Sequence, residues 1–474
     1  MWESPRYGFR VPVDSDDDGH GDLKELVIDV TGSAPSFDSP RRRLGSAFER
    51  LFASYPDKRP FKVLDLGAGK LRNTVHILKG KPSSEVWAVE YESLQATSDQ
   101  AQAAYKKART FSRFHDMSFP HQFTQANNAF DLILLVNVIS IMPIPAERLL
   151  MLHHCFQKLK KGGRLFWYSQ HGEPDYAVGG SRCNDQTRCG DGFYIGGKKY
   201  EKTFFREFEA SEIDEMMLAA GFTFEKAYTI ERNLARIYRK RPPAPLADMI
   251  NVAKIEALLS KGTKVEKPTG AEPRIIQRSK GQPEIKPDDP SLFDYDLFCA
   301  KRLRQIKAGK DGATMFHRLA ELVLRRAFRT SLRGWETEKE VNDGRGRIDL
   351  FAKNVAENGF FDRVRDHFGI KCPYISIECK NYSGDIGNNE LNQLASRLNP
   401  DPAHATRGQL GVLVCRSVRN TQRTIEQVRD RARKGEYILV LTDSDLQQFC
   451  AASRDGDSGV IDDLMENKLQ ALLA

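Results

Sequence analysis

Hydrophobic and polar positions follow the same kind of pattern in two parts of the chain, separated by a polar stretch. In residues 46–240, short apolar runs alternate with amphipathic helical stretches, which predicts a parallel α/β sheet covered by helices. Residues 241–290 are rich in Lys, Pro and Gly and can bury little apolar surface, so we expect a linker. Regular periodicity resumes near residue 312, and a second α/β domain is predicted at residues 291–474. A polar, acidic segment at residues 1–45 precedes both.

Composition agrees with a folded chain that has a weak preference for polyanions. The chain has 474 residues, of which 40% are hydrophobic and 29% charged, and its formal net charge is +8. Its longest apolar run, residues 130–145, contains Asp131 and Asn137 and is too short to cross a bilayer comfortably. No signal peptide is expected. We expect a cytoplasmic protein with no membrane partner, and an oligomer is compatible with the sequence.

A glycine turn follows the first strongly apolar run of the N-terminal domain. The run ends in Asp65-Leu66, and Gly67 and Gly69 follow before a helical stretch at residues 71–78. Glycines let a ligand approach the backbone closely, and the helix N-terminus offers free N–H groups. The next apolar run ends in Glu90, an acid placed to accept hydrogen bonds from a ribose diol. The pattern therefore predicts a ligand that contains a ribose.

The N-terminal domain as a whole resembles the class I S-adenosylmethionine-dependent methyltransferases. The matching motifs are VLDLGAG, VWAVE, FDLILLVNVI, LKKGGRLFWYS and a final GF hairpin. The resemblance implies a Rossmann-like, seven-stranded sheet with S-adenosylmethionine as cofactor, in which Glu90 holds the ribose hydroxyls and Asp116 lies near the adenine. The cofactor-binding residues that it implies are Asp65, Gly67, Gly69, Glu90 and Asp116.

Two departures from the family pattern leave the activity of this domain open. Leu71 stands where the family often has a third glycine, and no Asn/Asp-Pro-Pro-aromatic or Pro-Cys motif identifies the methyl acceptor. An insertion at residues 170–210 contains His171 and Tyr176, which either contact the substrate or belong to a plain surface loop. The alternative to a transferase is a non-catalytic module that senses a nucleotide or S-adenosylmethionine.

An acidic segment from Asp14 to Glu25 has the oxygen-ligand spacing of a calcium loop. Gly21, however, occupies the position where such loops carry a branched aliphatic residue, and there is no second copy of the loop. No helical pattern precedes Asp14 either. We therefore expect a solvated acidic segment here rather than a Ca²⁺ site.

The C-terminal domain contains a hairpin pattern followed by a strand with two charged positions. Residues 338–342 and 347–351 flank an Asp-Gly turn, which predicts the hairpin. Residues 374–380 predict a further strand, and its alternation places Glu378 and Lys380 on the same face. Charged groups on a largely apolar strand are costly unless they are paired or used in a site.

Together with Asp349 from the hairpin, these two residues predict a catalytic centre. Two carboxylates supply the oxygen ligands that Mg²⁺ or Mn²⁺ prefers, and such an ion would activate a water for attack on a phosphate. Lys380 could orient that water or neutralise the developing charge. The predicted metal ligands are Glu321, from the helix at residues 311–330, with Asp349 and Glu378.

This pattern resembles the PD-(D/E)xK, or restriction endonuclease-like, superfamily over about residues 311–445. The stretch ECKNYSGDIGNNELNQLASRL is especially similar to Mrr-type restriction endonucleases. The resemblance implies a separate restriction endonuclease-like α/β domain, with Gln393 projecting from a helix toward the site. The catalytic residues it implies are Asp349, Glu378, Lys380 and Gln393.

The two resemblances together predict a Mg²⁺-dependent DNA endonuclease fused to a methyltransferase-like domain, in bacterial restriction or anti-phage defence. DNA is the expected partner and RNA the alternative, and basic side chains at residues 416–434 favour contact with a phosphate backbone. Two other arrangements are compatible with the sequence. The first domain could regulate the nuclease as a sensor, or an active methyltransferase could be joined to a nuclease fold that only binds DNA.

Overall fold

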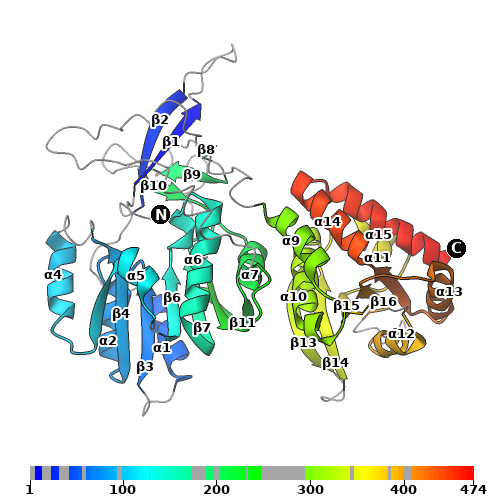
Figure 1. Cartoon of the computed structure of the whole chain (residues 1–474), viewed down its shortest axis with the longest axis horizontal. Coiled ribbons are helices and arrows are strands. Elements are labelled where there is room, and N and C mark those ends of the chain that lie inside the picture. The colour runs from blue at the N-terminus through cyan, green and yellow to red at the C-terminus, as the bar shows by residue number, and fades with distance from the viewer. Residues whose placement is uncertain are drawn as a thin grey trace. The chain divides into compact units, whose positions relative to one another are not determined.

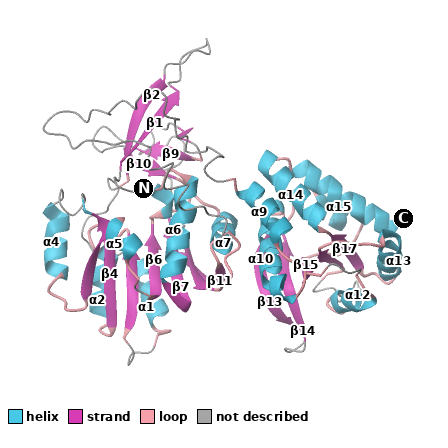
Figure 2. Cartoon of the chain, in the orientation of Figure 1, coloured by secondary structure: helices cyan, strands magenta, loops and turns pink. Residues whose placement is uncertain are grey.

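In the computed structural model, two compact units make up the chain, the first mainly from Met1–Pro242 and the second mainly from Asp294–Ala474 (Figures 1 and 2). The predicted calcium loop up to residue 22, Tyr176 and the greater part of the predicted linker lie outside the described residues. No helix of the described residues is long and apolar enough to cross a membrane. The structure describes residues 6–12, 23–30, 42–55, 60–92, 99–127, 129–172, 188–189, 191–195, 203–230, 233–246, 294–341, 346–382, 386–398 and 408–474.

A seven-stranded sheet forms the centre of the N-terminal unit, in the order β11-β12-β7-β6-β3-β4-β5. Strands β3 to β7 pair in parallel, whereas β12 pairs antiparallel with β7 and with β11. This is the sheet with an antiparallel edge that the sequence predicted, and it is consistent with a Rossmann-like methyltransferase. Its strands are β3 (Phe61–Leu66), β4 (Ser84–Tyr91), β5 (Phe114–Phe119), β6 (Phe130–Val136), β7 (Leu159–Ser169), β11 (Phe222–Ile230) and β12 (Asn233–Lys240).

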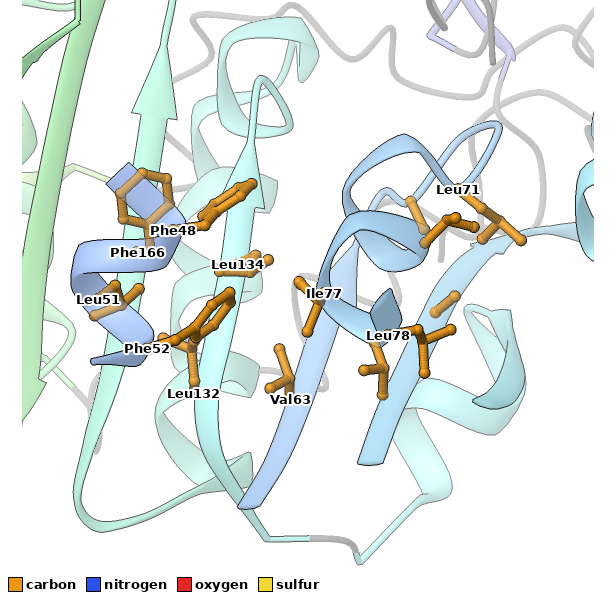
Figure 3. Packing of buried hydrophobic residues seen from close by; sticks show 14 of the residues in the cluster. Phe48, Leu51, Phe52, Val63, Leu71, Ile77, Leu78, Leu132, Leu134 and Phe166 are labelled. Atoms are coloured by element: carbon orange, nitrogen blue, oxygen red, sulfur yellow. The ribbon is translucent and has the colours of Figure 1, made fainter. Parts of the chain in front are cut away.

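Helices cover this sheet and bury its apolar strands. A hydrophobic cluster joins α1 and α2 to β3, β6 and β7, and in Figure 3 Phe48 and Phe52 of α1 and Ile77 and Leu78 of α2 point at the strands. Burying each such side chain contributes about 1.5–3 kcal/mol, so the cluster fixes α2 against β3 and with it the turn between them. The helices of this unit are α1 (Arg42–Phe52), α2 (Arg72–Gly80), α4 (Asp99–Ala108), α5 (His121–Gln125), η1 (Ile139–Ile141), α6 (Pro145–Lys158) and α7 (Ala210–Ala219).

Two small antiparallel sheets lie beside the large one. The first is a hairpin of β1 (Arg6–Pro12) and β2 (Leu23–Asp29). The second comes from the predicted insertion and has three strands: β8 (Arg188–Cys189), β9 (Gly192–Ile195) and β10 (Thr203–Phe205). Strand β10 contacts both β2 and η1, the 3-10 helix that follows β6. The insertion is therefore held near the carboxyl ends of the central strands (Figure 1).

The C-terminal unit is built on a five-stranded mixed sheet, in the order β13-β14-β15-β16-β17. Strands β13 to β15 pair antiparallel, as the predicted hairpin requires, and β15 to β17 pair in parallel. The strands are β13 (Leu332–Val341), β14 (Gly346–Asn354), β15 (Tyr374–Lys380), β16 (Leu410–Cys415) and β17 (Tyr437–Leu441). The helices are α9 (Tyr295–Gln305), α10 (Lys310–Ala327), α11 (Phe360–Asp366), α12 (Asn388–Ala395), α13 (Thr421–Ala432), α14 (Asp443–Asp455) and α15 (Ser458–Leu473).

Candidate functional site

The glycine turn after β3 has the backbone conformation that its glycines make accessible. Gly67 and Gly69 have φ angles of 69° and 53°, in the left-handed region that other residues rarely adopt. A Cβ on Gly67 would also lie 2.7 Å from Cγ2 of Val138. Leu71 has a φ of 61° as well, and its side chain is fully buried in the cluster of Figure 3. Leu71 thus reaches the conformation of a third glycine because core packing offsets the cost.

Glu90 closes this turn from the end of the neighbouring strand. Its Oε2 accepts a hydrogen bond from the Gly69 N–H at 2.7 Å, and Oε1 accepts one from the Tyr91 N–H at 2.9 Å. Burial raises the pKa of the Glu90 carboxyl to about 7. Each carboxylate oxygen can accept a second hydrogen bond. Glu90 and Gly69, both predicted to bind the cofactor, are therefore in direct contact. The Glu90 carboxylate can still accept a hydrogen bond from a ligand hydroxyl.

Buried oxygen acceptors lie at the carboxyl ends of the neighbouring strands β3 and β6. Asp65 Oδ2 accepts a hydrogen bond from the Thr74 hydroxyl at 2.6 Å, whereas its Oδ1 is buried and has no hydrogen-bond partner among the described residues. Asn137, directly after β6, likewise buries an Oδ1 that no described group contacts. Between β3 and β6 the strand order reverses, with β4 and β5 on one side and β7 on the other. Ligands of open α/β sheets bind at such a switch point.

These unpartnered oxygens test whether S-adenosylmethionine suits the site. Buried acceptors without donors are costly, by roughly 1–3 kcal/mol each. A ligand that brings an ammonium group would supply the missing donors to Asp65 and Asn137, and its ribose hydroxyls could donate further hydrogen bonds to Glu90. The residues present therefore fit this cofactor. Asn137 was not predicted as a site residue, although it ends the apolar run from which β6 was inferred.

Asp116 stands apart from this cluster. It lies inside β5, in register with Ala88 rather than with Glu90, and Ser118 is the residue of β5 that pairs with Glu90. The Asp116 carboxylate receives two hydrogen bonds from Arg109, at 2.5 and 3.1 Å, on the exposed surface. Asp116 thus takes part in a surface ion pair with Arg109, and its place near the adenine stays a prediction.

A buried arginine connects the insertion to the body of the N-terminal unit. Arg148 of α6 is 2% exposed and donates to both oxygens of Asp191, at 2.5 and 2.9 Å. Its Nε also donates to the carbonyl of Met142, and the guanidinium lies over the rings of Phe204 and Phe208. Within an amphipathic helix pattern an arginine is usually read as a surface residue, so the sequence carried no signal for this contact.

The candidate substrate residue His171 lies just beyond β7, where polar groups gather. Its Nδ1 is 3.2 Å from Oε1 of Glu207, and its backbone N–H donates to Oδ1 of Asn233 at 3.2 Å. The Asn233 amide donates in turn to the Tyr168 hydroxyl at 2.7 Å. His171 is therefore held by side chains at the carboxyl end of the sheet, rather than standing on an unattached loop.

In the C-terminal unit, four predicted catalytic residues come from three elements that meet. Lys380 Nζ donates to Glu378 Oε1 at 2.8 Å and to Oε1 of Gln393 on α12 at 3.1 Å. Asp349 of β14 accepts a hydrogen bond from the backbone N–H of Cys379 at 2.9 Å. The contact with Gln393 is the projection that the sequence resemblance implied. The acidic and basic groups thus gather at one end of β14 and β15.

The predicted metal ligands do not form a metal centre. The described residues contain no group of three or more His, Cys, Asp or Glu side chains that could hold a metal ion. Glu321 is 3% exposed, and its Oε1 receives two hydrogen bonds from Arg325, at 2.9 and 2.6 Å. Both oxygens of Glu378 are likewise bound by cations, Lys380 and Arg397. As arranged here, Glu321 and Glu378 do not fit a divalent ion, because cations already neutralise their charges.

His317 joins this centre and was not predicted from the sequence. It lies on α10 and hydrogen-bonds to the backbone of Cys379, and Asp349 and Lys380 are its charged neighbours. Burial lowers the pKa of the His317 imidazole. The available signal was its position four residues before Glu321, since residues at that spacing share a helix face.

The basic stretch predicted to contact a phosphate backbone is largely paired within the unit. Arg416 binds Asp443 at 2.6 Å and also donates to the carbonyls of Ile306 and Leu303. Arg431 pairs with Glu436, and Arg429 donates to the carbonyl of Ala471. These side chains therefore have structural partners, and their abundance alone no longer indicates a nucleic-acid surface.

Comparison with known proteins gives part-length structural similarity. No protein-family model matches the chain, and no curated protein matches it. A 1,6-didemethyltoxoflavin-N1-methyltransferase of Burkholderia thailandensis is similar at 18% identity and a TM-score of 0.29, over 44% of this chain and 95% of that one. An S-adenosylmethionine-dependent methyltransferase of Methanosarcina mazei is similar at 14% identity and a TM-score of 0.33, over 41% of this chain and 98% of that one. An O-methyltransferase family protein of Burkholderia thailandensis is similar at 14% identity and a TM-score of 0.31, over 42% of this chain. The chain spans only 57% of that protein.

Proposed function

We propose that the N-terminal unit binds S-adenosylmethionine and transfers its methyl group. The observation that carries this proposal is the convergence of the glycine turn with Glu90, Asp65 and Asn137 at the point where the strand order reverses. The cofactor would supply a methyl group on a sulfonium centre. The chain's own contribution is positioning: Glu90 holds the ribose hydroxyls, and Asp65 and Asn137 accept hydrogen bonds from the ammonium group.

The insertion supports an acceptor site over the same edge of the sheet. Arg148 anchors it through Asp191, and β10 contacts the 3-10 helix after β6. A covered site excludes water and lets a few polar groups orient the acceptor. His171, held beside Glu207, is placed to contact that acceptor.

The test uses the full chain and S-adenosylmethionine with a radioactive methyl group. Label should bind and pass to a macromolecule when DNA, RNA or cell extract is supplied in turn. Glu90→Gln should weaken this binding. The matched control is Glu85→Gln, on the same strand as Glu90 but outside the turn, and it should bind as the wild type does. Binding without transfer to any of these acceptors would favour the sensing module over the transferase. Absence of binding would reject both.

A second candidate function is phosphodiester hydrolysis in DNA by the C-terminal unit. Its specific support is the contact of Lys380 with both Glu378 and Gln393 beside Asp349, because it gathers the whole predicted catalytic set at one place. An ammonium at that position can neutralise charge that develops on a phosphate during cleavage. DNA is the proposed substrate, with RNA as the alternative, and restriction or anti-phage defence is the setting that we propose.

Supercoiled plasmid incubated with the full chain tests this second function. Parallel reactions contain Mg²⁺, Mn²⁺ or EDTA, so that the metal requirement is measured and not assumed. Replacing Lys380 or Asp349 by Ala should abolish nicking, whereas Lys353→Ala, an exposed lysine of β14, should not. Nicking that survives Lys380→Ala would reject the assignment. If labelled methyl transfer persists when nicking is absent, the C-terminal unit is not a nuclease, and a gel-shift assay then tests whether it binds DNA.

A further inference from the structure

Glu378 lies between two cations in the interior of the C-terminal unit. Its Oε1 accepts a hydrogen bond from Lys380 at 2.8 Å, and its Oε2 is bound by the guanidinium of Arg397. The side chains of Glu378 and Arg397 are 1% and 8% exposed. Arg397 follows α12, the helix that also carries Gln393. This ion pair is therefore nearly dry, and turning Arg397 to solvent would leave Glu378 with Lys380 as a cation partner.

Asp349 belongs to the same charge arrangement. It accepts the N–H of Cys379, the residue between Glu378 and Lys380, so its carboxylate lies beside the Glu378 backbone. Because Arg397 binds the Glu378 side chain, its positive charge lies near both carboxylates of the predicted centre.

An arginine can take the place of a divalent ion at such a pair. Guanidinium is planar, always charged and weakly hydrated, and its N–H groups match carboxylate oxygens. Mg²⁺ and Mn²⁺ need the same oxygens free of other cations, and a site cannot hold both charges without strong repulsion. We propose that Arg397 is the resident counter-cation of Asp349 and Glu378, and that it excludes divalent metal ions from them.

This inference rests on the same residues as the proposed nuclease site but makes a claim of its own. As a positioning residue, Arg397 keeps the two carboxylates together and oriented without a metal. Its removal should create a metal site where none exists. A purely structural ion pair would behave differently, since breaking it would lower stability without changing affinity for Mn²⁺.

The experiment measures Mn²⁺ binding to the full chain by the loss of the free-ion electron paramagnetic resonance signal. Mn²⁺ bound elsewhere on the chain is common to all variants, so the readout is the difference from the wild type. Arg397→Gln should gain one site with affinity at least about tenfold above the background, because Glu378 Oε2 loses its cation beside Asp349. Asp349→Asn added to Arg397→Gln should remove that site again. Arg397→Lys, which restores a cation, should bind Mn²⁺ as the wild type does.

Arg431→Gln is the matched control, because Arg431 also contacts α12, at Asn392, but lies outside the centre. If Arg397→Gln does not fold, a comparison of the wild type with Glu378→Gln still tests the inference. The two proteins should bind the same amount of Mn²⁺, because the wild type holds no ion at Glu378. Wild-type protein that binds an ion lost on Glu378→Gln would overturn the inference, and so would a folded Arg397→Gln variant without a new site. Failure of the nuclease proposal would appear separately, as uncut plasmid with these binding results unchanged.

Discussion

The carboxylate of Glu90 accepts a hydrogen bond from the backbone N–H of Gly69, with 2.7 Å between Oε2 and the nitrogen. The two residues are 21 positions apart in the sequence. Gly69 lies in the turn after β3, and Glu90 lies near the carboxyl end of β4, the parallel neighbour of β3. The contact keeps the turn closed and leaves acceptor capacity on a buried carboxylate. It also places an ionisable group where its charge is costly, and this cost can be measured.

Glu90→Gln should raise the stability of the empty protein above pH 7. The folded pKa of Glu90 is about 7 against an ordinary value of 4.5, so the folded state binds this proton more tightly than the unfolded state. Stability is therefore lost as pH rises from 4.5 to about 7, by about 3 kcal/mol in all. Glutamine escapes that loss. Melting temperatures across pH 5–8 should show the variant's advantage growing with pH.

The same variant should bind S-adenosylmethionine more weakly, by about tenfold or more, because the ribose loses a charged acceptor. Isothermal titration at pH 8 measures this difference, and the wild type should bind more weakly at pH 6 than at pH 8. Equal affinity of the variant and the wild type would show that Glu90 is a structural group and not a ligand for the ribose.

Gly67→Ala should destabilise the N-terminal unit more than Gly162→Ala. Both glycines have positive φ angles, 69° and 74°, which cost an alanine about 1–2 kcal/mol each. Only the Cβ at position 67 meets another atom, Cγ2 of Val138, and this clash adds about 1–3 kcal/mol. Thermal unfolding of the two variants measures the difference. Adding Val138→Ala should restore part of the loss at position 67, and no restoration would mean that φ strain alone is responsible.

Arg148→Ala should expose the insertion to proteolysis. The guanidinium is buried and binds both oxygens of Asp191, so its loss leaves Asp191 paired with Arg206 and costs about 1–3 kcal/mol. Arg164→Ala is the control, because its ion pair with Glu225 is partly exposed and worth about 0–1 kcal/mol. Limited proteolysis should cut the Arg148 variant first, within residues 191–205. Equal cutting of the two variants would contradict the anchoring role.

Glu378→Gln should destabilise the C-terminal unit by about 3–5 kcal/mol, because Arg397 and Lys380 lose the charge that they share. Removing the arginine at the same time should recover part of this loss. A double-mutant cycle with Glu378→Gln and Arg397→Gln, measured by urea unfolding, gives the coupling energy directly. Additive effects of the two substitutions would show that the residues do not stabilise each other.

Local sequence patterns were sufficient for the elements that carry the site. Alternating apolar residues located β3, β4 and β15, and the glycines located the turn, because each of these features depends on residues close in sequence. The place of Asp116 near the adenine was implied only by the family resemblance, and the local pattern did not show its ion pair with Arg109. Glu321 was correctly expected inside α10, but its partner Arg325 was not considered.

The sequence by itself determined that Glu378 would lie on a largely apolar strand, because periodicity shows which face of a strand turns inward. Only the tertiary structure decided which partner neutralises each of them. Glu378 is bound by Arg397, 19 residues away, and Arg148 by Asp191, 43 residues away. A buried charge must be paired, but Coulomb attraction falls with distance in space and not along the chain. The sequence therefore indicated the buried acid Glu378, and the fold supplied the arginine that pairs with it.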